Sequence, residues 1–224
     1  MLDKTSIIIP ISLNDEIRAK LFRWVKSFYE NVMPEVELCI GVANEKPFSK
    51  AKAINEAVRS SKGQYLVLAD ADIFYNPKLI EKSIEALAEH PWVIPYNEVL
   101  NVHRGSTDEL IQTEPQWPVS IELDTRPRTH GPRLRGGINI VTRENFDLVG
   151  GFDERFTGWG GEDDAFASSL NHLCGHYKRL EGTIYHLWHP ANNSSDENYK
   201  ANIELLKRYS NKEAVLEEIR KREK

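Results

Sequence analysis

Three short apolar runs near the start of the chain, each separated from the next by a stretch with helical spacing, constrain the fold most strongly. The runs are Thr5–Ile11, Glu37–Ala43 and Gln64–Ala69. Their nearly unbroken apolar character is typical of strands that are buried on both faces. Strands that alternate with helices imply a parallel sheet with right-handed crossovers. The sequence therefore predicts an α/β fold with a mainly parallel, Rossmann-like sheet flanked by helices.

Capping residues mark the helices between these strands. Asn14 or Asp15 can cap a helix over Glu16–Val32, and Ser49 can cap a helix that ends at Arg59. In open α/β sheets, ligands bind beyond the carboxyl ends of the strands. The acids of the Asp-Ala-Asp sequence that follows the third apolar run are therefore placed where a ligand would bind.

The second half of the chain has a different pattern. After a strand-like segment at Trp92–Asn97, the region from about His103 to Arg135 has little periodicity, so we expect a long loop that is functional or mobile. A strand and a short helix are expected in GGINIVTRENFDL, and a helix near Glu162–Cys174. GTIYHLWHP is expected to form a last strand, and Asn198–Lys224 one or two helices.

Composition bears on the class of function and on the compartment. The net charge is −5 and the pI is near 5.9, which argues against a nucleic-acid-binding domain, since such domains usually carry a basic patch. Cys39 and Cys174 form no CxxC pair, so neither a zinc site nor a disulfide framework is expected, and a reducing compartment is favoured. No segment approaches the length of a transmembrane span or resembles a signal sequence. We therefore expect a cytoplasmic protein.

The two acids of this D-x-D pattern, Asp70 and Asp72, form the first candidate site. At the end of a strand they point to different sides of the chain, so one can hold a divalent cation while the other reaches a neighbouring ligand group. Carboxylate oxygens suit Mg²⁺ or Mn²⁺ and leave room for phosphate oxygens. An ordinary junction between a strand and a turn would also place Asp here, so the pair alone leaves both interpretations open.

Two histidines in YHLWHP form the second candidate site. On a helical turn their spacing would place His186 and His189 on one face. In a strand they would lie on opposite faces, and only one would join a given metal site. Imidazole suits Mn²⁺ better than Mg²⁺. The alternative is that one imidazole caps a loop and the other packs against Trp188.

The third candidate site is the stretch TGWGGEDDAF. Its glycines, Gly158, Gly160 and Gly161, let the backbone pass close to a ligand or adopt positive φ angles. Trp159 offers a flat apolar face of the kind that stacks on a sugar ring. The acids Glu162–Asp164 lie at a predicted helix N-terminus, whose dipole stabilises carboxylates and partly offsets their mutual repulsion. An acid-rich cap alone would not explain the Gly-Trp-Gly-Gly that precedes it.

Four segments, in this order, resemble GT-A glycosyltransferases: FSKAKAINEAV, LADADIFYNP, RGGINIVTRENFDLVGGFDERFTGWGGEDDAF and YHLWHP. The similarity is strongest to the galactosyltransferase-type C-terminal module shared by β-1,4-galactosyltransferases, chondroitin polymerases and polypeptide N-acetylgalactosaminyltransferases. The front half also resembles family 2 glycosyltransferases. The resemblance runs from about Ser6 to Pro190. It implies a single GT-A domain with a nucleotide-sugar-binding half (1–100), an acceptor and catalytic half (101–192) and a C-terminal helical extension (193–224).

This resemblance implies a metal site and a donor site. Asp72 and His186 would hold Mn²⁺, with Mg²⁺ as a substitute, and Asp70 would contact the ribose side of the nucleotide. The galactosyltransferases place a Met ligand three residues before the His, where this chain has Thr183, so His189 or a water molecule would complete the site. The other residues on the donor side would be Lys50, Lys52, Asn55, which would fix its loop by hydrogen bonds, and Arg135.

The long loop also carries a basic cluster, which consists of Arg126, Arg128, Arg133 and Arg135. One interpretation is a solvated, mobile loop. The other is that Arg133 and Arg135 cover the diphosphate of the donor once the loop closes and exclude water that would hydrolyse it.

The resemblance also implies the chemistry. Asp163 would be the catalytic base, and Glu162 and Asp164 would orient the acceptor hydroxyls. The residues implied near the donor or acceptor sugar are Trp159, Gly160 and Gly161. The expected reaction is metal-dependent transfer of a sugar from a UDP-linked donor to a saccharide or other hydroxyl acceptor, with inversion. Two alternatives stay open: a non-catalytic sugar-binding module, and a metal-dependent nucleotidyltransferase, whose Gly-rich phosphate loop is absent from IPISLNDEIR.

Overall fold

Two β-sheets form the framework of the structure, a computed structural model that describes residues 1–128, 135–190 and 197–222. The larger sheet has the strand order β2 (Glu37–Val42), β1 (Thr5–Ile11), β3 (Tyr65–Ala69), β8 (Ile138–Thr142), β5 (Trp92–Ile94) and β9 (Lys178–Arg179). The smaller sheet has the order β4 (Ile73–Tyr75), β10 (Thr183–His186), β6 (Glu98–Val102) and β7 (Thr125–Pro127).

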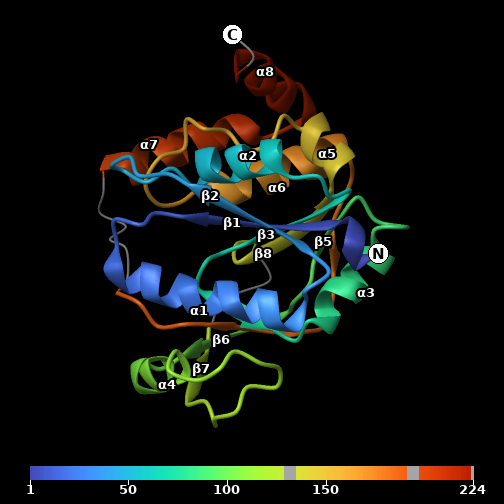
Figure 1. Cartoon of the computed structure of the whole chain (residues 1–224). Coiled ribbons are helices and arrows are strands. Elements are labelled where there is room, and N and C mark those ends of the chain that lie inside the picture. The colour runs from blue at the N-terminus through green and yellow to red at the C-terminus, as the bar shows by residue number, and fades with distance from the viewer. Residues whose placement is uncertain (129–134, 191–196, 223–224) are drawn as a thin grey trace.

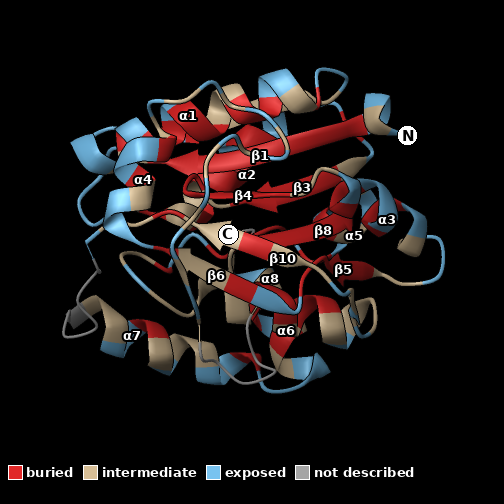
Figure 2. Ribbon diagram, turned by 90° about the horizontal axis from the view of Figure 1, so that it is seen from below, coloured by how far each residue is buried: buried red, intermediate tan, exposed pale blue. Residues whose placement is uncertain are grey.

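Helices cover both faces of the larger sheet (Figure 1). One layer consists of α2 (Lys50–Ser60), α5 (Arg143–Leu148), α6 (Glu162–Leu173) and α7 (Glu197–Leu206). The opposite layer holds α1 (Glu16–Val32) and α3 (Lys78–Ala86), while α4 (Arg104–Leu110) and α8 (Lys212–Arg222) lie at the two ends of the molecule in this view. Short 3₁₀ turns cover Leu2–Lys4 and Lys207–Tyr209. The central strands are buried between these layers (Figure 2).

The predicted alternation of strands and helices is confirmed in the first part of the chain. All seven residues of β1 are buried, and β1 pairs in parallel with both β2 and β3. The Asp15 side chain accepts bonds from the first-turn amides of α1, and the Ser49 side chain accepts one from the Lys52 amide of α2. Local sequence signals thus set these boundaries, because apolar runs and capping side chains act over a few residues.

The remainder of the framework is mixed rather than parallel. Strand β8 runs antiparallel to both β3 and β5, and β10 pairs antiparallel with β4 but parallel with β6. The three-residue strand β4 and the strand β6 were not expected, because such short segments carry little periodicity. The described helices include none that is long and apolar enough to cross a bilayer.

The expected long loop after His103 is partly wrong, since it contains α4 and the edge strand β7. Thr107 and Leu110 of α4 are buried, and the Trp117 ring packs 6.5 Å from the Phe74 ring. Residues 129–134, and therefore Arg133, lie outside the described residues. The segment after His103 is thus anchored by apolar contacts. Their residues are spaced too irregularly along the sequence to show a helical or strand period.

The predicted C-terminal helices, α7 and α8, form a small core of their own against α6. Phe156, Ala165, Tyr209 and Val215 are its buried members. A buried polar network lies beside it. Asp153 accepts a bond of 2.6 Å from the Tyr209 hydroxyl and forms an ion pair of 2.7 Å with Arg155, which also contacts Glu218 at 2.7 Å. The extension is therefore joined to the loop that follows α5 by polar as well as apolar contacts.

We predict that Tyr209→Phe lowers the free energy of unfolding by about 1–3 kcal/mol, because it leaves buried Asp153 without one donor. Arg222, which donates to the same hydroxyl at 2.6 Å, also loses a partner. Urea denaturation monitored by circular dichroism measures the change. Tyr199→Phe is the matched control on α7, where the tyrosine contacts Trp159 through its ring. Equal stability of wild type and Tyr209→Phe would contradict the role of the network.

Candidate functional site

A cavity of about 830 Å³ opens at the carboxyl ends of β1 and β3. Its wall includes Pro10 and Ile11 at the end of β1, Asp70 directly after β3, and Gly136 and Gly137 before β8. The residues predicted for the site that line this cavity are Asp70, Asp72, Trp159, Glu162, Asp163, His186 and His189. Segments that are far apart in the sequence therefore meet in one hollow.

Strand pairing brings the first histidine to the D-x-D acid. Strand β4 begins immediately after Asp72 and runs antiparallel to β10, with His186 opposite Ile73. The Leu187 amide also donates a bond of 2.8 Å to the Asp72 carbonyl. Because β10 ends at His186, the chain turns there and His189 also reaches Asp72. Both imidazoles join one site, which the strand interpretation of this segment did not allow.

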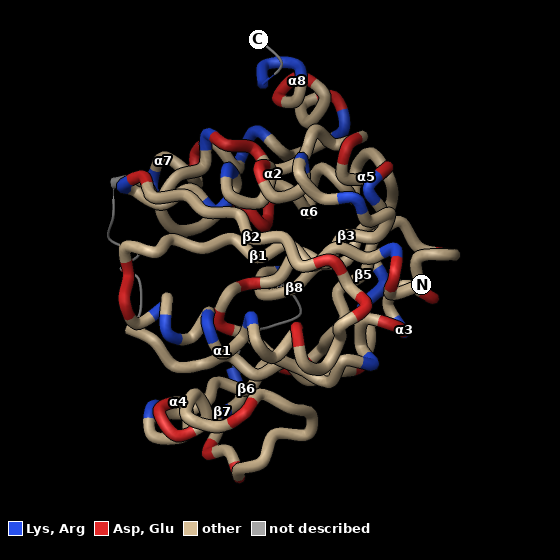
Figure 3. Tube along the Cα trace, in the orientation of Figure 1, with Lys and Arg blue, Asp and Glu red and all other residues tan. Residues whose placement is uncertain are grey.

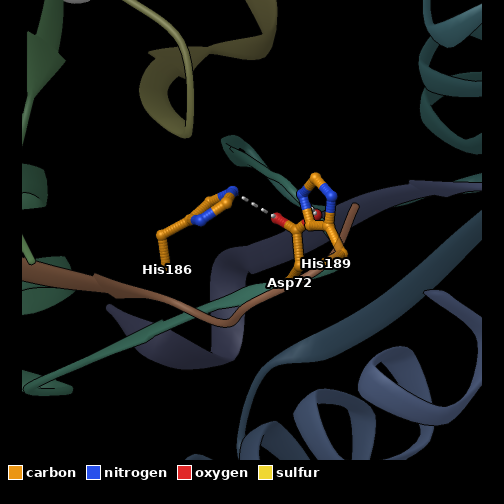
Figure 4. Close-up of side chains that lie close together, drawn as sticks. All are labelled: Asp72, His186 and His189. Carbon is orange, nitrogen blue, oxygen red and sulfur yellow. Dashed lines mark ion pairs between the residues drawn. The ribbon is translucent and has the colours of Figure 1, made fainter. Parts of the chain in front are cut away.

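The three side chains form a group that fits a divalent metal ion (Figure 4). One ligand atom from each of Asp72, His186 and His189 lies within 4.8 Å of the others. His186 Nε2 is 3.8 Å and His189 Nε2 is 3.2 Å from the Asp72 carboxylate. The His189 Nδ1 atom lies 2.8 Å from the Pro190 carbonyl, which can accept its proton and leave Nε2 free as a ligand. A carboxylate with two imidazoles suits Mn²⁺ better than Mg²⁺.

Thr183, which the resemblance places where galactosyltransferases have a Met ligand, does not belong to this group. Its hydroxyl donates a bond of 2.7 Å to Glu98 at the exposed start of β10. Among the described residues, His189 therefore supplies the third potential ligand.

Charges around Asp72 keep it ionised. Burial opposes its charge, but His186, His189 and Arg18 together hold the pKa of Asp72 well below its ordinary value. Burial lowers the pKa of His186, whereas the contact with Asp72 raises the pKa of His189 against the effect of its own burial. Arg18 Nη1 lies 3.1 Å from Asp72 Oδ2. Arg18 could not be identified from the sequence, because it has the usual appearance of an arginine in the first turn of a helix.

A second charged cluster lies around Lys50, at the N-terminus of α2. The Lys50 amine is 3.0 Å from both carboxylate oxygens of Asp163 and 2.8 Å from Asp70 Oδ1. Glu162 is 3.9 Å from the same amine. Burial, together with Glu162 and Asp70, raises the pKa of Asp163 to about 7, although Lys50 acts in the opposite direction. Asp163 can therefore exchange a proton near neutral pH.

The loop before α6 places Trp159 at the edge of the cavity. Trp159 is 46% exposed, and its ring stacks on the Tyr199 ring of α7, with centroids 5.3 Å apart. The amide of Asn202, also on α7, donates to the Thr157 carbonyl at 2.9 Å. The C-terminal extension therefore holds this loop from outside the cavity.

Gly160 and Gly161 have a packing role in this loop. Both have φ angles of 96°, which glycine adopts without strain. A Cβ atom on Gly160 would lie 3.2 Å from the Tyr199 ring, and one on Gly161 would lie 2.9 Å from Phe156. Neither glycine is among the residues that line the cavity, whereas Gly158 is. Of the two interpretations given for these glycines, positive φ is therefore observed.

Two other residues predicted for the donor side, Lys52 and Asn55, do not line the cavity. Lys52 forms an ion pair with Glu45, and Lys50 rather than Lys52 lines the cavity. Asn55 is buried, and its side-chain amide bonds with both the amide and the carbonyl of Phe152 at 2.9 Å. It therefore fixes the Gly-Gly-Phe-Asp-Glu loop after α5 rather than a loop of its own FSKAKAINEAV segment.

Arg135 and Asp164 pair with each other at 3.5 Å, and neither lines the cavity. Arg126 and Arg128, the other described members of the basic cluster, do line it. Along the described part of the chain, Lys and Arg positions are mixed with Asp and Glu positions, so positive charge is not confined to one segment (Figure 3).

Comparison with known protein families gives two matches. Residues 24–137, which are 114 of the 224 residues, match the family described as glycosyl transferase family 2. Residues 118–190 match the N-terminal domain of galactosyltransferase. Together the two matches span residues 24–190, which include the cavity-lining residues from Glu45 to His189.

Two curated relatives illustrate the similarity. Chondroitin sulfate N-acetylgalactosaminyltransferase 2 of Mus musculus is 27% identical over 190 residues, which cover 80% of this chain and 34% of that protein. Beta-1,4-galactosyltransferase 7 of Mus musculus is 31% identical over 68 residues, which cover 30% of this chain and 18% of that protein. The chain thus spans about a third or less of the length of these relatives.

Solved structures share the fold. The catalytic domain of Drosophila β-1,4-galactosyltransferase 7 in complex with xylobiose has a TM-score of 0.52 and 18% identity, covering 89% of this chain and 79% of that one. GalNAc-T7 with UDP, GalNAc and Mn²⁺ has a TM-score of 0.60 and 13% identity, covering 92% of this chain and 48% of that one. The mixed sheets flanked by helices are therefore those of the GT-A fold.

We predict that the protein binds one Mn²⁺ ion and that His186→Ala and His189→Ala each weaken this binding by about tenfold or more, since each removes one ligand atom. Isothermal titration calorimetry with MnCl₂ measures the affinity. His172→Ala, which changes an exposed histidine in α6, is the matched control. Wild-type affinity in His189→Ala would exclude that residue as a ligand.

Proposed function

Because the chain belongs to glycosyl transferase family 2, we propose that it transfers a sugar from a UDP-linked donor to the hydroxyl group of an acceptor in a metal-dependent, inverting reaction. One observation carries the proposal: the metal-binding group around Asp72 and the titratable acid Asp163 line the same cavity. Solved structures of the same fold contain manganese with UDP-Gal in one case and Mn²⁺ with UDP in another, which supports the choice of metal and nucleotide.

The metal site would neutralise the leaving group. Asp72, His186 and His189 would hold Mn²⁺, which when bound stabilises the negative charge that develops on the departing diphosphate. Arg126 and Arg128 line the same cavity and add positive charge there. Asp70, whose carboxylate is held by Lys50 at 2.8 Å, would contact the ribose side of the nucleotide.

Asp163 would act as the general base. The acceptor oxygen forms a bond to the anomeric carbon as the bond from that carbon to the diphosphate oxygen breaks, and the hydroxyl proton passes to a carboxylate oxygen of Asp163. Lys50 orients this carboxylate by contacting both of its oxygens at 3.0 Å. A carboxylate has further lone pairs, so it can still accept the proton. Attack opposite the leaving group inverts the anomeric centre.

The acceptor would bind beside Trp159. Its exposed ring offers a surface for stacking on a sugar, and Glu162 lies next to the base in the cavity wall. The acceptor class we propose is a saccharide or another molecule with a free hydroxyl group. A cytoplasmic location remains a prediction from the sequence.

We predict that the wild-type protein with Mn²⁺ slowly hydrolyses one of the common nucleotide sugars and that Asp163→Asn lowers this rate by about 10²–10⁴-fold, the usual contribution of a general base. UDP binding is expected to be largely kept, because Asp163 contacts Lys50 rather than the metal group. Release of free nucleotide from a panel of donors measures the rate. Asp147→Asn, an exposed change on α5, serves as the control.

The same assay separates the alternatives. A nucleotidyltransferase would release pyrophosphate from a nucleoside triphosphate and leave the donor sugars intact. A non-catalytic module would bind a nucleotide sugar without releasing nucleotide. Either result would overturn the proposed reaction.

We predict that kcat/KM for donor hydrolysis at saturating Mn²⁺ rises with pH through about 7, since the raised pKa of Asp163 keeps the base protonated below that pH. Lys50→Met removes the cation that favours the ionised form, so the midpoint should move to higher pH. Lys52→Met, whose lysine pairs with Glu45 and does not itself line the cavity, should leave the midpoint in place. A midpoint shared by wild type and Lys50→Met would contradict this assignment of the base.

A further inference from the structure

One cation of the chain lies directly against the metal-binding group. Arg18, in the first turn of α1, contacts Asp72 Oδ2 through Nη1 at 3.1 Å and His189 Nδ1 through Nη2 at 3.3 Å. Its side chain is 27% exposed and lines the cavity. The guanidinium therefore contacts two of the three side chains that would hold the metal.

A bound dication and this guanidinium cannot both keep these positions. Arginine stays protonated in proteins, so it cannot reduce the repulsion by losing its proton. Like charges a few ångströms apart at a partly buried site repel strongly. A second carboxylate offers an alternative partner, because Asp15 Oδ2 lies 3.8 Å from Arg18 Nε. The side chain can therefore leave Asp72 without losing every acidic neighbour.

Arg18 also competes for the tautomer of His189. When His189 donates its Nδ1 proton to the Pro190 carbonyl at 2.8 Å, Nε2 keeps a free lone pair for a metal. Arg18 can donate to Nδ1 only when that atom carries no proton, which places the proton on Nε2 and blocks the ligand. The charge of Arg18 and the His189 tautomer that it favours therefore both oppose metal binding.

A freed guanidinium would face the diphosphate that the metal chelates. Arginine binds phosphate oxygens through two parallel hydrogen bonds, which gives it both strength and orientation. Arg18 is already in the wall of the cavity, so its side chain needs only to rotate to reach a ligand held at Asp72.

We propose that Arg18 is an internal counter-ion of the metal site, which opposes metal binding in the free protein and changes partner to the nucleotide diphosphate when the donor binds. This inference rests on the proposed function. Its consequence is that Mn²⁺ and the nucleotide bind with positive coupling, since each binding event favours the displaced position of Arg18 and coupling between two ligands is reciprocal.

The test is calorimetric titration of Mn²⁺ alone and of UDP at saturating Mn²⁺. For Arg18→Met we expect Mn²⁺ alone to bind about tenfold tighter than in wild type, and UDP to bind about tenfold weaker. Arg18→Lys keeps a charge without the planar pair of donors, so its Mn²⁺ affinity should stay near wild type while UDP binding is only partly restored. Arg23→Met, an exposed change on the same helix, is the matched control.

The opposite signs of the two effects distinguish the proposal from a general loss of structure, which would weaken both. Unchanged or weaker Mn²⁺ binding in Arg18→Met, or unchanged UDP binding, would overturn the inference. If Arg18→Met does not fold, Arg18→Gln replaces it with the same expectations. Failure of the proposed function has a different signature, which is a wild-type protein that binds neither Mn²⁺ nor UDP.

Discussion

Charge balance inside one cavity is the constraint on which the rest of the site depends. The carboxylates of Asp70, Asp72, Glu162 and Asp163 are among those that line the same hollow, and unpaired charges of one sign would repel each other strongly there. Two cations among the described residues contact them: Lys50 in the first turn of α2, which follows β2, and Arg18 in the first turn of α1, which follows β1. The fold thus brings a cation to each acid of the D-x-D pair.

The aspartate beside Lys50 and the aspartate beside Arg18 differ in their tendency to bind a proton. Lys50 is close to three carboxylates, yet Asp163 still has its pKa raised to about 7 by burial and its acidic neighbours. Asp72, with two imidazoles and Arg18 around it, stays fully ionised. One carboxylate is therefore suited to exchange a proton, and the other to hold a cation. The division of roles follows from the surroundings, since both side chains are aspartates.

Much of this arrangement could be predicted from the sequence. The rest depends on contacts between residues that are far apart in the chain, which leave no local pattern. Strand β1, helix α1 and their caps follow from signals within a few residues. Asp72, Asp163 and His186 could be identified because the motifs that contain them are themselves distinctive. The contact of Arg18 with His189 joins residues 171 positions apart, and no local signal reports it. Short elements such as β4 and α4 were missed for the same reason, because their tertiary contacts rather than their own periodicity define them.

Helix α7 packs against the Trp159 loop, so the residues that shape the entrance of the cavity are separate from those around Asp72 and Lys50. Tyr199 and Asn202 lie outside the cavity, yet they hold the aromatic ring at its edge. Changes on this helix can therefore alter the shape of the entrance while the residues around Asp72 and Lys50 stay as they are. A chain built in this way can diversify the molecules it accepts during evolution without rebuilding its reactive centre.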